Sequence, residues 1–281
     1  MNEQYAVLMV DLKNSRGYDS KGRNLIQQYY SSVILVLNRM FRNEIICEVC
    51  FSAGDEVQGL FRRPEAAYLY YRLISSCLYP IQTHASIGVG NVDVRQENKN
   101  SCCQDGKAYH SARDAINRAD SSIGYPVILL SNSEHDRIIN SVIGTTAMMA
   151  MKFSITQNQV FLLTELLFPL PCEGIKVERN EDIVELIQMK LDFDHNFGGP
   201  QRTIQKMDRL PSPQTTVHIK ASAGQESTEY YITAGAEHVS TQIISDILGM
   251  TRGSIFRTLK CADIFIIRNM TIAAIEEMQK I

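Results

Sequence analysis

Apolar and polar positions alternate along the first half of the chain with two different periods, which indicates both strands and helices. Residues 5–10, YAVLMV, form a continuous apolar run, as expected for a strand that is buried on both faces. Between residues 22 and 42, apolar residues recur every four positions and predict one face of a helix. The pattern as a whole predicts strands at residues 5–10, 45–52, 56–61, 84–92 and 125–131, and helices at 22–42, 65–79, 108–119 and just after Ser133.

The order of the predicted elements, βαββαβαβ, is typical of an α+β sheet with helices packed on it. Its first six elements match a ferredoxin-like core, in which the end of the first strand lies beside the turn between the second and third strands. Asp11 ends the first strand, and Asp55 lies in that turn. We therefore expect these two carboxylates, which are far apart in the sequence, to be neighbours in space.

Two carboxylates that lie close together repel each other, and the ways to relieve this repulsion indicate what the pair can bind. At a separation of about 4 Å the two charges repel by about 4 kcal/mol at an effective dielectric constant near 20. A fold keeps such a pair by sharing a proton or by binding a cation, and Mg²⁺ is commonly held by one or two carboxylates with waters and phosphates. The pair therefore indicates a divalent metal site, with two solvated turn residues as the alternative. Glu56 should point to the other face of its strand, behind the site or into solvent.

After residue 150 the pattern becomes mainly helical. Helices are predicted at 155–167, where two prolines follow, and at 181–191. Residues 193–228 are rich in Gly, Pro, Ser, Thr and Gln, which is typical of a linker or a long loop. These changes divide the chain into a first domain at residues 1–145, a helical connector at 146–192, the linker or long loop at 193–228 and a C-terminal domain at 229–281.

Residues 240–261 have the pattern of a helix-turn-helix, to which the helix at 155–167 is a candidate third member. The first helix ends at Gly249, which can adopt the positive φ of a sharp turn, and Thr251 caps the second helix. Three basic residues and one acid give this stretch a local charge of +2. The side chains placed to contact DNA are Arg252, Ser254, Arg257, Thr258 and Lys260. The alternative is a helical hairpin that packs on the first domain or mediates dimerisation.

The overall composition narrows the classes of protein that fit this pattern. The 281 residues carry a net charge of −3, so the whole chain does not indicate nucleic-acid binding, although a local basic patch can be hidden in the sum. No apolar run approaches the roughly 18 residues that cross a bilayer, and no signal peptide is recognised, so no membrane association is expected. Seven cysteines, an odd number, indicate reduced thiols and a cytoplasmic protein.

The cysteine spacing does not predict a zinc site. Cys47 and Cys50 form a C-x-x-C on a predicted strand, where residues three apart should face opposite sides. No second pair with suitable spacing follows, and Cys102 and Cys103 lie in a polar loop. We therefore assign no role to these four residues from the sequence.

Four stretches resemble, in the same order, the motifs of the class III nucleotidyl cyclase catalytic domain, a relative of the polymerase palm. They are DLKNSRG at residues 11–17, AGDEVQGLF at 53–61, HASIGVGNV at 84–92 and DGKAYHSARDAINRA at 105–119. With its C-terminal helix-turn-helix, the chain is similar to the bacterial SatD family, which has the same pattern of motifs. The resemblance implies a nucleotidyl-cyclase-like sheet.

The resemblance also implies roles for particular residues. Asp11 and Asp55 correspond to ligands of Mg²⁺ or Mn²⁺, with the backbone carbonyl of Leu12 as a further ligand. His110 stands where the cyclases have an Asn that orients the ribose. Arg113 corresponds, one residue short of the family spacing, to the cation that stabilises the transferring phosphate. Two subunits of that family pair head to tail and share each active site, so a homodimer is implied as well.

Three further cations are candidates for binding a triphosphate. Lys13 and Arg16 closely follow the first motif's Asp, and Lys107 lies near the start of its helix, where backbone N–H groups also favour phosphate. A solvated surface position is the alternative for each of the three. Phe51 occupies the position where many adenylyl cyclases carry a base-reading Lys, so the resemblance leaves the base unidentified.

Two classes of function follow from these observations. In the first, the protein binds a divalent metal and a nucleoside triphosphate, with nucleotidyl cyclase and nucleotidyltransferase as the candidate activities, and a helix-turn-helix couples it to double-stranded DNA. In the second, it is a DNA-binding transcriptional regulator whose cyclase-like domain is catalytically degenerate and serves dimerisation or ligand sensing. The pair of Asp11 and Asp55 favours the first class. The residue at Phe51, the spacing of Arg113 and the added helix-turn-helix favour the second.

Overall fold

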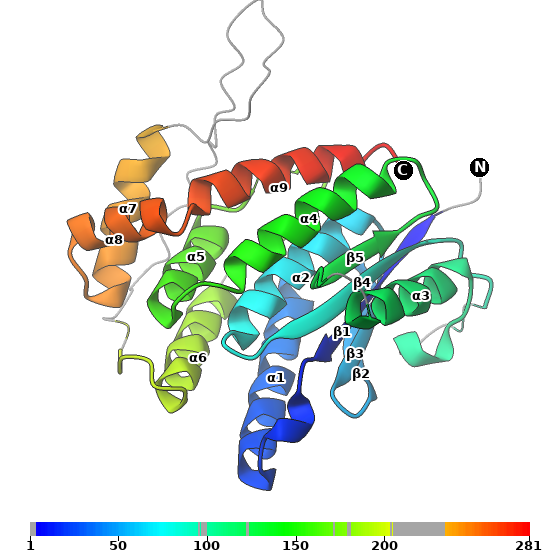
Figure 1. Cartoon of the computed structure of the whole chain (residues 1–281), viewed down its shortest axis with the longest axis horizontal. Helices are drawn as coiled ribbons and strands as arrows, with labels where there is room; N and C mark the ends of the chain where they lie inside the picture. Colours follow the sequence, from blue (N-terminus) through cyan, green and yellow to red (C-terminus); the bar gives the residue numbers. More distant parts are fainter. Residues whose placement is uncertain are drawn as a thin grey trace, which may run out of the picture.

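A five-stranded sheet lies at the centre of the protein, with helices packed on both faces (Figure 1). The computed structural model describes residues 4–94, 96, 100–121, 124–170, 172–178, 181–202, 204 and 234–281. The strands are β1 (Tyr5–Leu12), β2 (Ile45–Ala53), β3 (Glu56–Phe61), β4 (Thr83–Gly90) and β5 (Val127–Leu130), in the order β2-β3-β1-β4-β5. Neighbouring strands are antiparallel except β4 and β5, which are parallel. The expected mixed α+β architecture is thus confirmed.

The helices follow the strands and then continue through the C-terminal half. Those of the first half are α1 (Ser20–Met40), α2 (Pro64–Leu78), α3 (Lys107–Ser121) and α4 (Asp136–Ala150). The later ones are α5 (Ile155–Leu167), α6 (Asp182–Asn196), α7 (Ala234–Leu248), α8 (Arg252–Cys261) and α9 (Ile264–Met278). Two short 3-10 helices, η1 (Ser15–Gly17) and η2 (Ser101–Cys103), follow β1 and β4. In the described part of the chain, no helix combines the length and the apolar character needed to span a membrane.

The residues of β1 face the two sides of the sheet alternately, because side chains alternate along a strand. Leu8 and Val10 belong to the large apolar core on the side of α1 and α2. Val7 and Met9 belong to a smaller cluster on the side of α3. Asp11 continues the second series, so this residue lies on the α3 side at the end of the strand.

Helix α3 lies very close to β4, and small residues make this approach possible. A Cβ at Gly88 would come within 2.1 Å of the backbone nitrogen of Ala112, so only glycine fits there. Ala108 and Ala112, both 0% exposed, form the side of the helix that meets the strand. This contact fixes the position of α3, and of the predicted site residues it carries, against the sheet.

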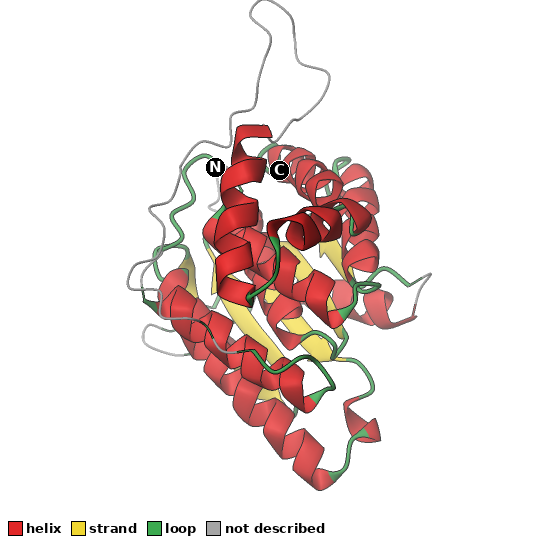
Figure 2. Cartoon of the chain, turned by 90° about the vertical axis from the view of Figure 1, so that its left-hand side faces the viewer, coloured by secondary structure: helices red, strands yellow, loops and turns green. Residues whose placement is uncertain are grey.

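The C-terminal helices pack back on the first part of the chain. Helix α9 lies along α4 (Figure 1) and also contacts α2, while α5 contacts α2, α6, α7 and α8. Figure 2 shows from the side how helices lie over the strands of the sheet. Glu165 of α5 joins these layers through buried ion pairs, to Arg72 of α2 at 2.9 Å (Oε2 to Nη2) and to Arg268 of α9 at 2.5 Å (Oε1 to Nη1). The Arg72 Nη1 also donates a hydrogen bond to the Thr271 hydroxyl at 2.8 Å. A buried charge network therefore connects three helices that are far apart in the sequence.

The turn between α7 and α8 has the local geometry that its sequence predicts. Gly249 has φ +62°, and the Thr251 hydroxyl accepts a hydrogen bond from the Ser254 N–H at 3.2 Å. Ile255 and Leu259 are both 0% exposed and face inward. The linker predicted at 193–228 begins in the last turn of α6, and most of it, from residue 205 onward, lies outside the described residues.

A bulge in β2 corrects the expectation for its two cysteines. Cys47 pairs with Leu60 of β3, and Cys50 pairs with Gln58, so three steps along β2 correspond to two along β3. The extra residue turns the strand locally, as a β-bulge does. Cys47 and Cys50 therefore face the same side of the sheet, and the prediction that they face opposite sides is wrong.

Candidate functional site

The end of β1 and the turn between β2 and β3 place three carboxylates around one tyrosine. Asp11 lies near the end of β1, Asp55 in the turn, and Glu56 at the start of β3. Tyr30 of α1 is 0% exposed. Burial, and then the charges of Asp11, Asp55 and Glu56, raise the pKa of its hydroxyl well above the ordinary value. The structure thus brings the two predicted metal ligands together, beside a hydroxyl that keeps its proton.

Two polar atoms at this place lack hydrogen-bond partners. The Oδ2 atom of Asp55 and the hydroxyl of Tyr30 are both buried and accept or donate no hydrogen bond in the described structure. Asp11 differs, since its Oδ1 accepts a hydrogen bond from the Leu12 N–H at 3.0 Å. Leaving a buried polar group unsatisfied costs about 1–3 kcal/mol, and more for a charged group. A ligand that brings a cation to Asp55 and an acceptor to Tyr30 would remove this cost.

Arg113 reaches the same cluster from α3 through Glu56. Its Nη1 and Nη2 atoms donate to the two Glu56 oxygens at 2.6 and 2.8 Å, a bidentate geometry. Burial alone would raise the pKa of Glu56, but hydrogen bonds from Arg113 and Ser52 lower it below the ordinary value. The hydrogen bond to Glu56, and the charges of Glu56 and Asp11, raise the pKa of Arg113. Glu56 thus lies next to the aspartate pair and fixes the orientation of the arginine through the bidentate contact.

A cavity of about 340 Å³ opens beside Asp55, between the first half of α1 and the turn from β2 to β3. The rings of Tyr18, Tyr30 and Phe51 line it, and Arg23 brings a positive charge. The remaining lining residues are Leu12, Ser15, Ile26, Gln27 and Gly54. This lining suits a flat ring that carries an anionic group, because aromatic walls favour stacking and the arginine attracts negative charge.

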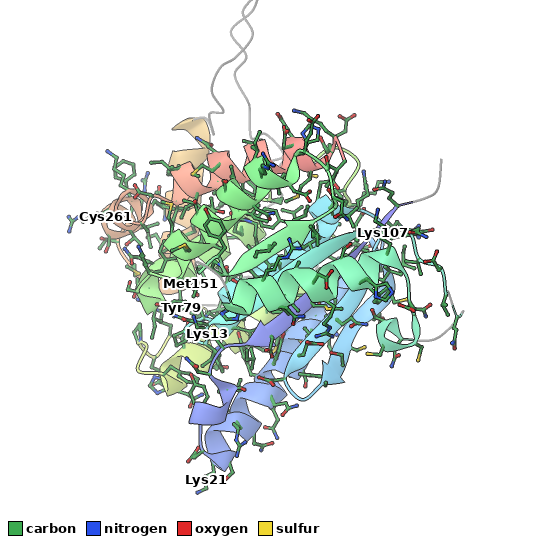
Figure 3. The ribbon with its side chains drawn as sticks, turned by 45° about the vertical axis from the view of Figure 1, so that its right-hand side comes forward. Lys13, Lys21, Tyr79, Lys107, Met151 and Cys261 are labelled. Carbon is green, nitrogen blue, oxygen red and sulfur yellow. The ribbon has the colours of Figure 1, made fainter. Side chains whose placement is uncertain are left out.

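Two predicted residues on α3 do not join this group. Lys107 begins α3 at the opposite end of β1 from Asp11, and Figure 3 shows it far from Lys13, which follows β1. The side chain of His110 is 74% exposed, and its Nε2 lies 3.3 Å from an oxygen of Asp105. The helix runs from one end of the sheet towards the other, so its first turn is remote from the carboxylates, and of its three predicted residues Arg113 is the one that reaches them.

The cations that follow β1 are placed differently from one another. Lys13 is exposed, next to the end of β1, and its backbone N–H donates to the Gln82 carbonyl at 2.8 Å. The side chain of Arg16 lies outside the described part of the structure, so its predicted role stays a prediction. Arg23, near the start of α1, brings a positive charge to the cavity among the described residues, and sequence reasoning missed it. In the sequence, Arg23 lies one helical turn before Gln27 and two before Tyr30, so the three side chains are expected on the same face of α1. This spacing is the sequence feature that could have indicated Arg23.

Sequence reasoning also missed His84. This residue lies directly opposite Asp11 in the antiparallel pairing of β1 with β4. Side chains at such paired positions lie on the same face of the sheet, with Cβ atoms about 4.5–5.5 Å apart. Pairing the two apolar runs as antiparallel strands could have identified it. Asp11 follows the first run and His84 precedes the second, so both lie at the same end of the strand pair.

The ligand set suits an ion that arrives with its substrate. Among the described residues, no three His, Cys, Asp or Glu side chains are grouped so that they could hold a metal ion by themselves. Asp11 and Asp55, with the Leu12 carbonyl, supply few ligands, all of them oxygen. Mg²⁺ is commonly bound in this way, because it keeps several waters and takes further oxygens from phosphates. The unpartnered Asp55 Oδ2 fits the same ion.

Helix α8 presents basic side chains to solvent, away from the carboxylate cluster. The helix buries Ile255 and Leu259, and it packs on α5 and α7. Its threonine Thr258 donates a hydrogen bond to the Ser254 carbonyl at 2.9 Å, so that hydroxyl is already engaged within the helix. The exposed predicted residues are Arg252, Arg257 and Lys260.

Comparison with known proteins gives one family and weak structural likenesses. The sequence model of the SatD family matches residues 5–169, which is more than half of the chain. Two solved structures of a bacterial light-regulated adenylyl cyclase match at 14% and 15% identity, with TM-scores of 0.35 and 0.34. Each match covers 46% of this chain, and 43% and 76% of the respective cyclase chains. A likeness this weak does not bear on activity, and no curated protein matches the chain.

Proposed function

The chain belongs to the SatD family, and we propose that it binds a nucleoside triphosphate with Mg²⁺ or Mn²⁺ where β1 ends and β2 turns into β3. The observation that carries this proposal is the buried Asp55 Oδ2, which has no hydrogen-bond partner and lies beside Asp11 and an open cavity. A carboxylate oxygen in this position is satisfied by a cation. The cavity next to it accommodates a ring with an attached anion.

Each residue of the proposed site has a separate task. Asp11, Asp55 and the Leu12 carbonyl would hold the ion, which, when bound, neutralises phosphate charge and orients phosphate oxygens. The Tyr30 hydroxyl stays protonated, because burial and the three carboxylates raise its pKa, and so it can donate a hydrogen bond to the ligand. Arg23 attracts the anionic part of the ligand into the cavity.

Nucleotidyl transfer is a further proposal that rests on this binding. Arg113 is held in a fixed orientation by Glu56 and lies close enough to Asp11 for its pKa to respond to that charge. A guanidinium so placed can stabilise negative charge that develops on a phosphate. The order β1-α1-β2-β3-α2-β4, with β1 central between β3 and β4, supports a ferredoxin-like core for this site. A head-to-tail homodimer, implied by the cyclase resemblance, is part of the same proposal.

We propose a second function, DNA binding, for the helices α7 and α8. The exposed side of α8 carries Arg252, Arg257 and Lys260, and its ten residues, RGSIFRTLKC, include no acid. The opposite side buries Ile255 and Leu259 against α5 and α7. A helix fixed through one face and basic on the other suits the major groove. If the first site binds no triphosphate, the protein is instead a DNA-binding regulator with a degenerate cyclase-like part.

Thermal unfolding tests the triphosphate site. The full chain is heated with ATP, GTP, CTP or UTP, with and without Mg²⁺ or Mn²⁺. A ligand at about 100 times its Kd stabilises the protein by about 2.7 kcal/mol, which shifts the Tm of a chain this size by several degrees. We expect a shift that needs both metal and nucleotide, and that Asp55→Asn abolishes. Asp105→Asn, which changes an exposed acid at the far end of the sheet, should keep the shift. No shift with any nucleotide, or equal shifts in both variants, contradicts the proposal.

A further inference from the structure

Three thiols gather at the edge of the sheet, outside the carboxylate cluster. The bulge in β2 places Cys47 and Cys50 on the same face of the strand. Cys102 of η2 lies against this strand, and its thiol is 4.0 Å from the carbonyl oxygen of Phe51. The sulfur of Cys50 is within hydrogen-bonding reach of both the Cys102 thiol and the Ser101 N–H. Two cysteines that are 52 positions apart (102 − 50) in the sequence are therefore neighbours in space.

The contact is held by groups other than the sulfur atoms. Ser101 is 0% exposed, and its hydroxyl lies 3.2 Å from Nε2 of Gln58 and 3.1 Å from the hydroxyl of Tyr109. These bonds join η2 to β3 and α3. The sulfur atoms are consequently kept close whether or not they are bonded to each other.

The thiols differ in their access to solvent. Cys102 is exposed, Cys50 is half-buried and Cys47 is buried. Burial raises the pKa of the Cys50 thiol to about 11, so at neutral pH it is protonated. A reagent from solvent therefore meets Cys102 first, with Cys50 in position to react second. In the described part of the chain the thiols do not form a group that could hold a metal ion.

We propose that Cys50 and Cys102 are a redox site, which forms a reversible disulfide when the protein meets a peroxide. The Cys102 thiolate attacks one peroxide oxygen, the O–O bond breaks, and Cys102 becomes a sulfenic acid while hydroxide leaves. The Cys50 sulfur then attacks the Cys102 sulfur, the S–O bond breaks, and the proton of Cys50 leaves with the hydroxyl group as water. In sum, two thiols and one hydrogen peroxide give one disulfide and two waters. A thiol reductant then restores the two cysteine thiols by thiol–disulfide exchange and is itself oxidised to a disulfide.

The bond would join η2 to β2 one residue before Phe51, whose ring lines the cavity. Disulfides in a reducing compartment are commonly transient and redox-sensing rather than structural. This site needs no nucleotide and does not depend on the function proposed for the carboxylates.

The test is to oxidise the purified full chain with hydrogen peroxide, to alkylate the free thiols, and to analyse tryptic peptides without reduction. Trypsin leaves Cys47 and Cys50 on the peptide 43–62, and Cys102 and Cys103 on the peptide 100–107. We expect these peptides to be joined, two of the seven thiols to be lost, and both effects to be reversed by dithiothreitol. Recovery of the two peptides unlinked, with Cys102 carrying only sulfinic or sulfonic acid, would overturn the proposal.

Single variants identify which sulfur atoms are joined. Cys50→Ser and Cys102→Ser should each abolish the link, and Cys47→Ser and Cys103→Ser should each keep it. Cys103 is the matched control, because it is also exposed but its thiol lies 3.3 Å from an oxygen of Asn100. Loss of the link in Cys103→Ser alone would show that the neighbouring thiol is the reactive one. A link that persists in Cys102→Ser would also show that Cys103 reacts in place of Cys102. Either outcome refutes the assignment.

Discussion

Replacing Glu165 by glutamine should destabilise the protein more than any surface change of the same chemistry. The side chain of Glu165 is 5% exposed and shares its two oxygens between Arg72, 6% exposed, and Arg268, 1% exposed. The change removes one negative charge and leaves two buried guanidinium groups without a counter-charge. Removing one partner of a buried pair costs about 3–5 kcal/mol. At about 2–4 °C for each kcal/mol in a chain of this size, the Tm should fall by roughly 6–20 °C.

The pKa of Glu165 agrees with this view of the network. Burial would raise it, but the charges of Arg72 and Arg268 and their hydrogen bonds lower it below the ordinary value. The carboxylate is therefore ionised in the folded protein, and its negative charge stabilises the two buried guanidinium groups.

Thermal and urea unfolding of the full chain measure the effect. Glu185→Gln is the control, since Glu185 pairs with Arg39 on the surface, where the two side chains are 55% and 50% exposed. That change should cost less than about 1 kcal/mol. Equal losses in the two variants would refute the reasoning. A triple variant, Arg72→Met with Glu165→Leu and Arg268→Met, should recover most of the stability, because it removes the unpaired charges as well as the pair.

Two further predictions concern the carboxylate cluster and α8. Because the pKa of Glu56 is lower in the folded protein than its ordinary 4.5, the unfolded chain binds the proton more readily, and stability should fall as pH drops below about 4.5. Glu56→Gln should remove this part of the profile in thermal unfolding between pH 7 and 3, and an unchanged slope would contradict it. The double variant Arg252→Ala/Arg257→Ala should weaken binding to random-sequence duplex DNA and lower the salt slope by up to about 2, whereas Arg39→Ala/Arg42→Ala should not. Equal affinities of the two double variants would exclude α8 as the contact.

The element order was enough to predict the meeting of Asp11 and Asp55. Strand periodicity located β1, the Gly-Asp turn located the tip between β2 and β3, and the alternation of strands and helices gave the architecture. These features are local or follow from connectivity. A single sequence carries both kinds of information, because periodicity and turn chemistry depend on neighbouring residues.

Other parts of the site depend on how elements rotate and run against each other. His110 and Arg113 are one turn apart on α3, yet one faces solvent and the other reaches Glu56. The direction of α3 along the sheet decides that Lys107 is remote from Asp11. The bulge that turns Cys47 and Cys50 to one side adds a residue without any glycine or proline to mark it. The spacing of residues along the chain does not predict how a helix is rotated and directed on the sheet, or where a strand has a bulge.

The buried network also decides which part of the chain can be studied alone. The match to the SatD family ends at residue 169, only four residues after Glu165 (169 − 165). The second arginine of the network, Arg268, comes from α9, almost 100 residues beyond that limit (268 − 169 = 99). A chain cut after residue 169 would lose this arginine and expose the apolar sides of α4 and α5, on which α9, α7 and α8 pack. Since α2 packs on both β1 and β4, the loss would extend to the strands that carry Asp11 and His84. The proposed triphosphate site therefore depends on helices outside the matched region, and its tests require the full chain.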